Sequence, residues 1–241
     1  LVDQKLQADV KNKVDVVMFQ YDGAGVAYDR TEPMDCKVGD TSPKCNGGAT
    51  SHSGGYTYAD YSKVVGYPEV HSDGEIWAQT LWDLRAKLGS GTTESLVTRA
   101  MSLSPSNPSF LDERNAILLA DMATTGGDHQ DAIWKVFAHR GLGYFAGSFG
   151  GNDSSPGASF EIPPTGSATG SISGTVTDSV SGDPIEGATV TVAFEGSPFV
   201  INPTVTTAAD GTYSLGPIPQ GTYPKVTIAA PGFDGVTAPL T

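Results

Sequence analysis

The sequence lacks any long hydrophobic run. None of its 241 residues lies in a stretch of about 18 consecutive apolar side chains, so it predicts no membrane-spanning helix. Basic residues are also few: 14 lysines and arginines stand against 27 aspartates and glutamates, for a net charge of −13. Because an acidic surface repels phosphate groups, we expect neither nucleic-acid binding nor attachment to an anionic membrane.

Several enzyme motifs are missing as well. The sequence contains no H-E-x-x-H zinc motif, no G-x-S-x-G nucleophile motif and no glycine-rich phosphate loop. Without such a ligand set, we expect no metal site on this chain alone.

Cysteine is scarce, with only Cys36 and Cys45 in the segment MDCKVGDTSPKC. Their spacing is not that of a zinc site, and the turn-rich loop favours a disulfide over two free thiols. A bridge that closes so short a loop stabilises by about 2–3 kcal/mol. Disulfides persist in oxidising compartments, so we expect the chain to be secreted and extracellular.

The composition changes sharply along the chain. Residues 1–150 hold every tryptophan, every histidine and all the helical patterns, and residues 151–169 form a polar, proline-containing linker. In residues 170–241, apolar and polar residues alternate between turn signals, as in half-buried strands. We therefore expect a multidomain chain: a mainly α-helical subdomain followed by a small all-β antiparallel sandwich. The sandwich should fold by itself, because the linker has few apolar residues.

Four helices are expected in the first region. Ser72 caps the first, and Glu75 completes its capping box. This helix buries one stripe, formed by Trp77, Leu81, Leu84 and Leu88. The others should run from about Thr93 to Leu103; from an Asn107 cap, with Leu111, Leu118 and Met122 on one face, to Gly126; and from Asp128 to Gly141. Upstream, residues 3–12 suit a helix, residues 14–19 a strand and residues 22–67 mainly loop.

Four histidines are candidates for chemistry. His52 lies in a polar loop and is expected to be exposed and idle. His129 is near a helix start and His139 near a helix end, where the helix dipole explains His139 structurally. His71 differs, because it stands at a helix start among Glu69, Asp73 and Glu75. Such surroundings can tune an imidazole as a proton donor or oxyanion partner, although spacing alone favours a structural role.

Longer motifs carry a resemblance. The segments EVHSDGEIWAQTLWDLR and FLDERNAILLAD…AIWKVFAHRG, with the trailing FEIPP, resemble the C-terminal part of the fungalysin family of secreted zinc metallopeptidases. That family is similar in plan to the thermolysin-type enzymes. The resemblance covers roughly residues 20–163.

The resemblance implies roles for particular residues. In the family, two histidines of H-E-x-x-H and a downstream glutamate hold zinc, and these ligands precede the part that this chain resembles. His71 matches the family histidine that donates a hydrogen bond to the tetrahedral oxyanion, with Glu69 and Asp60 both candidates to orient it. A family arginine that contacts the substrate backbone is replaced by Ala27 in AGVAYDR, and Arg30 is the candidate substitute.

The tail has a resemblance of its own. The segments GSISGTVTDSVSGDPIEGATVTV and TTAADGTYSLGPIPQGTYPKVTIAAPGF resemble the transthyretin-like, carboxypeptidase-regulatory type of β-sandwich. Such domains accompany secreted hydrolases. We expect Tyr213 and Tyr223 to lie in its core and find no catalytic candidate there.

These observations predict the C-terminal portion of a secreted zinc-dependent endopeptidase that acts on peptide or protein substrates. Zinc and its ligands would belong to a missing N-terminal half, so the chain alone should be inactive. The alternative is a non-catalytic extracellular binding or structural protein that keeps the helical subdomain and the sandwich.

Overall fold

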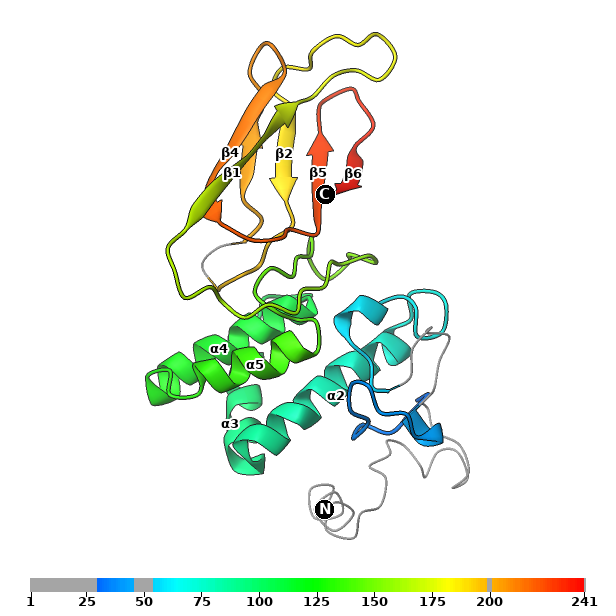
Figure 1. Ribbon diagram of the computed structural model, residues 1–241, viewed down its shortest axis with the longest axis vertical. Helices are drawn as coiled ribbons and strands as arrows, with labels where there is room; N and C mark the ends of the chain where they lie inside the picture. The colour runs from blue at the N-terminus through cyan, green and yellow to red at the C-terminus, as the bar shows by residue number, and fades with distance from the viewer. Residues whose placement is uncertain (1–29, 46–53, 199–200, 241) are drawn as a thin grey trace.

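The computed structural model describes residues 30–45, 54–198 and 201–240. The helix expected at 3–12, the strand at 14–19 and His52 lie outside these residues. In Figure 1 the helices form one half of the molecule and the strands the other, as the sequence predicts. None of the helices in the described ranges is long and apolar enough to cross a membrane.

The helical half contains the four expected helices and two short 3-10 turns. The turns are η1 (Pro43–Cys45) and η2 (Tyr58–Asp60), and the helices are α2 (Val70–Leu88), α3 (Ser90–Met101), α4 (Phe110–Thr125) and α5 (Gln130–His139). The described residues 30–45 and 54–67 are otherwise mainly loop, as expected.

The start of α2 differs from the sequence prediction. Glu69, not Ser72, is the N-cap: its carboxylate accepts the backbone N–H groups of His71 and Ser72. The helix therefore begins three residues earlier than a Ser72 cap would allow. Glu75 completes no capping box there, because its carboxylate is buried against the backbone of Thr31.

The start of α4 also differs. Ser109 caps this helix, in a capping box with Asp112, whereas Asn107 lies outside it with φ of +61°. A residue in that left-handed conformation cannot serve as an extended N-cap. The expected face is partly wrong too, since Met122 is 53% exposed although Leu111 and Leu118 are buried. The helix ends before Gly126, as predicted.

The helical core forms where these elements meet. Of the stripe expected on α2, Leu84 is fully buried, and its other three members are half-buried against the same core. The principal buried side chains are Leu84, Leu96, Leu111, Ile117, Ile133, Phe137 and Leu142. Burial of apolar area at about 25 cal/mol per Å² drives this packing.

The second half is an antiparallel β-sandwich. Its strands are β1 (Thr169–Thr175), β2 (Thr189–Val192), β3 (Thr204–Thr206), β4 (Thr212–Pro219), β5 (Lys225–Ala229) and β6 (Val236–Pro239). One sheet pairs β1 with β4, and the other has the order β3-β2-β5-β6. Inward residues of β2 are fully buried while alternate threonines lie outward, which matches the predicted period of two. Tyr223 is buried in the core, and Tyr213 packs partly against it.

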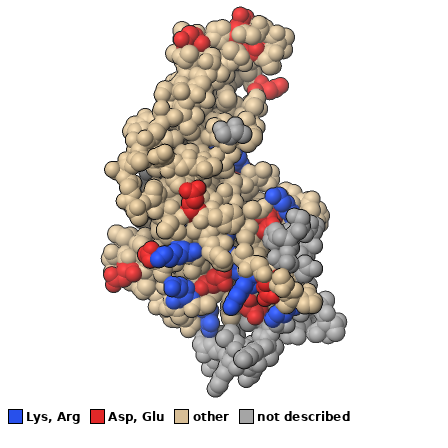
Figure 2. Space-filling model, in the orientation of Figure 1, with Lys and Arg blue, Asp and Glu red and all other residues tan. Residues whose placement is uncertain are grey.

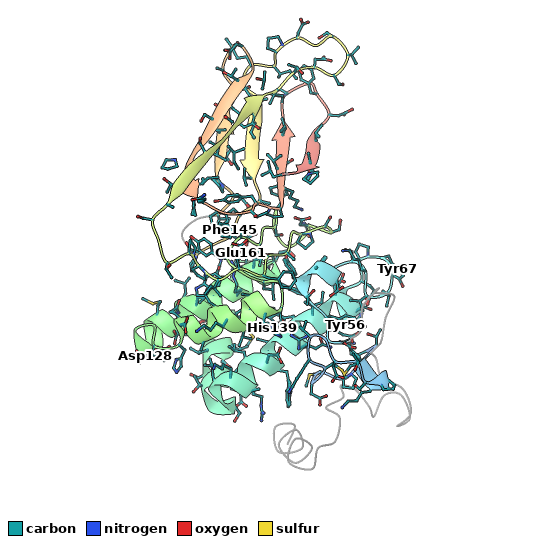
Figure 3. The ribbon with its side chains drawn as sticks, in the orientation of Figure 1. Tyr56, Tyr67, Asp128, His139, Phe145 and Glu161 are labelled. Carbon is teal, nitrogen blue, oxygen red and sulfur yellow. A yellow bond between two sulfur atoms is a disulfide. The ribbon has the colours of Figure 1, made fainter. Side chains whose placement is uncertain are left out.

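Residues 143–161 join the two halves closely. Their backbone folds back on itself, with Gly143 donating to Ser159 and Gly157 to Gly147. The side chain of Phe145 projects from this segment into the sandwich core, where its ring centroid lies 6.0 Å from that of Phe194. Figure 3 shows Phe145 at the base of the sandwich, above the helices. Coupling between the halves therefore comes from Phe145, before the expected linker, and from Asp153 and Gly157 within it. The domain boundaries at 150 and 170 stay a prediction.

Buried polar contacts cross the same junction. The guanidinium of Arg114, on α4, donates to the carbonyls of Leu142 and Gly143 at 3.0 and 2.8 Å, and to the Glu195 carbonyl of the sandwich. Lys225 of β5 pairs with Asp153 at 2.6 Å, and both side chains are almost fully buried. Removal of one partner of so buried a pair strongly destabilises the folded protein, because the other charge is left unpaired.

Three glycines permit close approach at this junction. A Cβ atom on Gly147 would lie 2.2 Å from the Ala193 carbonyl oxygen, and one on Gly157 would lie 2.0 Å from the Pro224 ring. A Cβ on Gly221 would lie 2.1 Å from the Phe145 ring. These contacts leave no room for a side chain at any of the three positions: Gly147 packs against backbone, and Gly157 and Gly221 pack against rings.

Candidate functional site

The candidate site is the exposed N-terminus of α2. Gly66, with φ of +86°, and Pro68 turn the chain into extended backbone at Glu69, from which the helix starts. His71 is the second helical residue, and its side chain is 66% exposed. Tyr67, just upstream, lies at the outer edge of the molecule in Figure 3. The local sequence thus presents an imidazole to solvent from a rigid element.

Glu69 orients the imidazole of His71. The Nδ1 atom of His71 lies 2.7 Å from Oε1 of Glu69, while Oε2 of Glu69 accepts the backbone N–H groups of His71 and Ser72. Hydrogen bonding from the His71 side chain, then from the two amides, lowers the pKa of Glu69 to about 2. Because Nδ1 is engaged by the Glu69 carboxylate, Nε2 is the ring nitrogen that is left to donate to another group.

Of the two carboxylates considered from sequence, only Glu69 forms this contact. The Asp60 carboxylate instead accepts the backbone N–H and the hydroxyl of Thr57, at 2.8 and 2.9 Å, and caps η2. Sequence reasoning left this choice open because both residues lie upstream of His71 at short range.

Arg30 lies on the buried side of α2. It lines a cavity of about 10 Å³ together with Glu32, Glu75 and Gln79. Such a volume holds one water at most, so the cavity has no room for a peptide. Contact between Arg30 and a substrate backbone therefore stays a prediction.

Glu75 is a buried carboxylate beside this cavity. Its oxygens accept the N–H and hydroxyl of Thr31 and the N–H of Glu32, at 2.9 to 3.2 Å. Burial raises the pKa of Glu75 to about 7, despite these hydrogen bonds. Because Glu75 holds the 31–32 segment on α2, its role in this structure is to attach that loop.

The other two described histidines have structural positions. His129 is the N-cap residue of α5, and its Nδ1 atom lies 2.8 Å from the buried carboxylate of Asp121. His139 is the last residue of α5 and is exposed. In Figure 3 His139 lies among the helices, whereas Asp128 lies at their outer end. The position of His139 at the end of α5 agrees with the structural role expected for it.

The predicted disulfide is present, with the Cα atoms of Cys36 and Cys45 5.5 Å apart. A residue that sequence reasoning missed anchors it: the buried Arg140 donates to the Cys36 carbonyl at 2.7 Å and to the Tyr56 carbonyl at 2.8 Å. Its Nε atom also pairs with Asp83 at 2.6 Å. A signal existed, since Arg140 follows the buried Phe137 by three positions and, as the C-cap residue, continues the core-facing side of α5.

The described residues do not fit a zinc site. No group of three or more histidine, cysteine, aspartate or glutamate side chains within them is placed to hold a metal ion. Two of the described histidines pair with single carboxylates, His71 with Glu69 and His129 with Asp121. In Figure 2 the charged side chains gather over the helical half, and this face of the sandwich is mostly uncharged.

Comparison with known proteins places these features in a family. Residues 49–146 match the fungalysin metallopeptidase (M36) family, and residues 171–241 match the carboxypeptidase regulatory-like domain. The exposed His71 and its Glu69 partner both lie within the first match.

Individual relatives agree. The chain is 38% identical over 109 residues to extracellular metalloproteinase 2 of Arthroderma gypseum, which covers 36% of this chain and 17% of that protein. It is 38% identical over 104 residues to extracellular metalloproteinase MEP of Neosartorya fischeri, covering 34% and 16%. It is 32% identical over 143 residues to extracellular metalloproteinase 2 of Trichophyton tonsurans, covering 48% and 22%. The chain thus spans about a fifth of the length of these relatives.

The two family matches fall on the helical half and on the sandwich. Over residues 49–146 the chain matches the fungalysin metallopeptidase (M36) family, and over residues 171–241 it matches the carboxypeptidase regulatory-like domain.

Proposed function

We propose that this chain is the C-terminal portion of a secreted zinc-dependent endopeptidase and that His71 stabilises the oxyanion formed during peptide-bond hydrolysis. The observation that carries the proposal is the Glu69–His71 pair at the exposed start of α2. The relatives' names, all extracellular metalloproteinases, and the Cys36–Cys45 disulfide support the extracellular location.

The chemistry assigned to His71 follows from its contacts. As water attacks the scissile carbonyl, negative charge develops on the carbonyl oxygen. With Glu69 on Nδ1, the imidazole is oriented to donate its Nε2–H to that oxygen. Placement on a helix, rather than on a loop, keeps the donor in position before the reaction.

Zinc and the water it activates belong, in this proposal, to an N-terminal half outside this chain. That half is the proposed partner and would bring the H-E-x-x-H motif that the sequence lacks. The isolated chain is therefore inactive and holds no stoichiometric zinc. Hydrolysis of peptides by the isolated 241-residue chain would contradict this division of roles.

The test uses the longer protein that includes the metal-binding half. His71→Ala should lower kcat/KM by about 10²–10³, as removal of one oxyanion donor does, with zinc content unchanged. His139→Ala is the matched control, because it also removes an exposed helix-end histidine, and its rate should stay near wild type. Loss of zinc in His71→Ala, or an equal loss of rate in both variants, would refute the assignment.

The second candidate is a non-catalytic extracellular binding protein. The observation in its favour is the missing ligand set, since a chain without zinc ligands can still keep both folded halves. The gene sequence immediately upstream separates the two, because an H-E-x-x-H there supports the peptidase and excludes this alternative.

A further inference from the structure

A cavity of about 180 Å³ lies between the start of α2 and the start of α4. Because one water needs only about 10–15 Å³, this volume can hold an amino-acid side chain. Its walls include Tyr58 and Tyr61 of the η2 region, Val70 and Asp73 of α2, Phe110 of α4 and Asp153 of the junction segment. Val70, at 81% exposed, directly precedes His71.

One wall of the cavity is aromatic. The rings of Tyr58, Tyr61 and Phe110 form a triangle with centroids 5.8 to 6.0 Å apart, and two of the three pairs meet edge to face. Such rings pack against the aliphatic stem of a long side chain and attract a cation within about 6 Å of a ring face.

The cavity is also acidic. Asp73 is 4% exposed, and its two oxygens accept neutral backbone donors, the N–H group of Ser62 at 2.8 Å and that of Glu69 at 3.1 Å. Asp153 is balanced by Lys225 at 2.6 Å. The lining, all of it in the described ranges, includes no lysine, arginine or histidine.

Both carboxylates act on the same ring. The pKa of the Tyr61 phenol is raised, first by burial and then by the negative charges of Asp73 and Asp153. A purely apolar side chain in this cavity would remove water from the Asp73 carboxylate without replacing it, which is costly. A cation would instead pair with the Asp73 carboxylate, so charge complementarity favours a positively charged occupant.

We propose that this cavity binds the side chain of a lysine or arginine residue of a peptide, with its stem against the three rings and its charged head near Asp73. Nothing in this binding requires zinc or His71, so the inference stands or fails independently of the proposed function.

Binding is tested on the 241-residue chain by NMR, with ¹⁵N-labelled protein. The probes are N-acetyl-lysine-N-methylamide and its uncharged counterpart, N-acetyl-norleucine-N-methylamide. The lysine probe should shift the amides of Ser62, Gly150 and Gly151 and bind at least tenfold more tightly than the norleucine probe. Equal affinity for both probes, or shifts confined to other regions, would overturn the inference. Tighter binding of agmatine than of the blocked lysine would overturn the assignment to a peptide side chain.

A pair of variants separates the cavity from general charge attraction. Val70→Lys places a competing cation beside the cavity without removing any buried contact, and Val180→Lys adds the same charge at a remote valine that is 94% exposed. We expect Val70→Lys to weaken the lysine probe at least tenfold and Val180→Lys to change it less than twofold. An equal weakening in both would show attraction to the acidic surface as a whole and would overturn the site.

Discussion

Phe145 is the side chain through which the helical half enters the core of the sandwich, so its removal tests whether the halves are one folding unit. The ring is 2% exposed and contacts Phe194, Tyr223 and Tyr144, with centroids 5.0 to 6.0 Å apart. Truncation of a buried phenylalanine to alanine costs about 3–5 kcal/mol through lost burial and the cavity left behind. For a chain of this size, that loss corresponds to a Tm lower by roughly 6–20 °C.

Tryptophan fluorescence offers a one-sided probe. All three tryptophans lie in α2 and α5, so their emission reports the helical half alone, whereas circular dichroism reports both halves. If the halves unfold together, Phe145→Ala shifts both signals by the same amount. Phe160→Ala is the control, because that ring is 56% exposed and its loss should cost far less. A tryptophan transition left unchanged by Phe145→Ala would refute the idea that the sandwich supports the helices.

Two further outcomes are expected. Replacing Cys36 and Cys45 together by alanine should lower the free energy of unfolding by about 2–3 kcal/mol in urea titrations, and protein from its native source should resist alkylation until reduced; freely reactive thiols there would contradict the bridge. Since the pKa of Glu75 is raised to about 7 from an ordinary 4.5, the folded state holds this proton more tightly than the unfolded chain, and stability falls as pH rises between these values. Glu75→Gln should remove this part of the pH dependence, measured by urea unfolding at pH 4.5 and 7.5, and an unchanged slope would disprove it.

The sequence predicted the elements of the fold better than their ends. Period and turn residues indicated four helices and a sandwich, because burial of one face dictates those patterns. The predicted cap of α2 was wrong because several acceptors compete at that start. Glu69 accepts the Ser72 amide, which the expected capping box assigned to Glu75. Met122 was placed on the wrong face because its stripe was read without knowing which neighbours cover it.

The candidate site was likewise predicted only in part from the sequence. His71 was found from its resemblance to a family motif, but only coordinates distinguish Glu69 from Asp60 as its partner. The buried arginines were missed, although Arg114 lies three residues after Leu111 and four before Leu118, on the core face of α4. Charged residues are ordinarily solvated, and the carbonyls that satisfy Arg114 come from distant segments that the local pattern cannot reveal.

The glycine contacts at the junction have a consequence for distance. A sandwich on a flexible tether would sample a volume set by the length of the chain, and its effective concentration near α2 would fall as that tether grew. Here Gly147 packs against the Ala193 backbone and Gly157 against the Pro224 ring, both too closely for the glycine to carry a side chain. The sandwich is therefore a rigid spacer. A ligand bound at its far end in Figure 1 is held at a constant distance and angle from the helices.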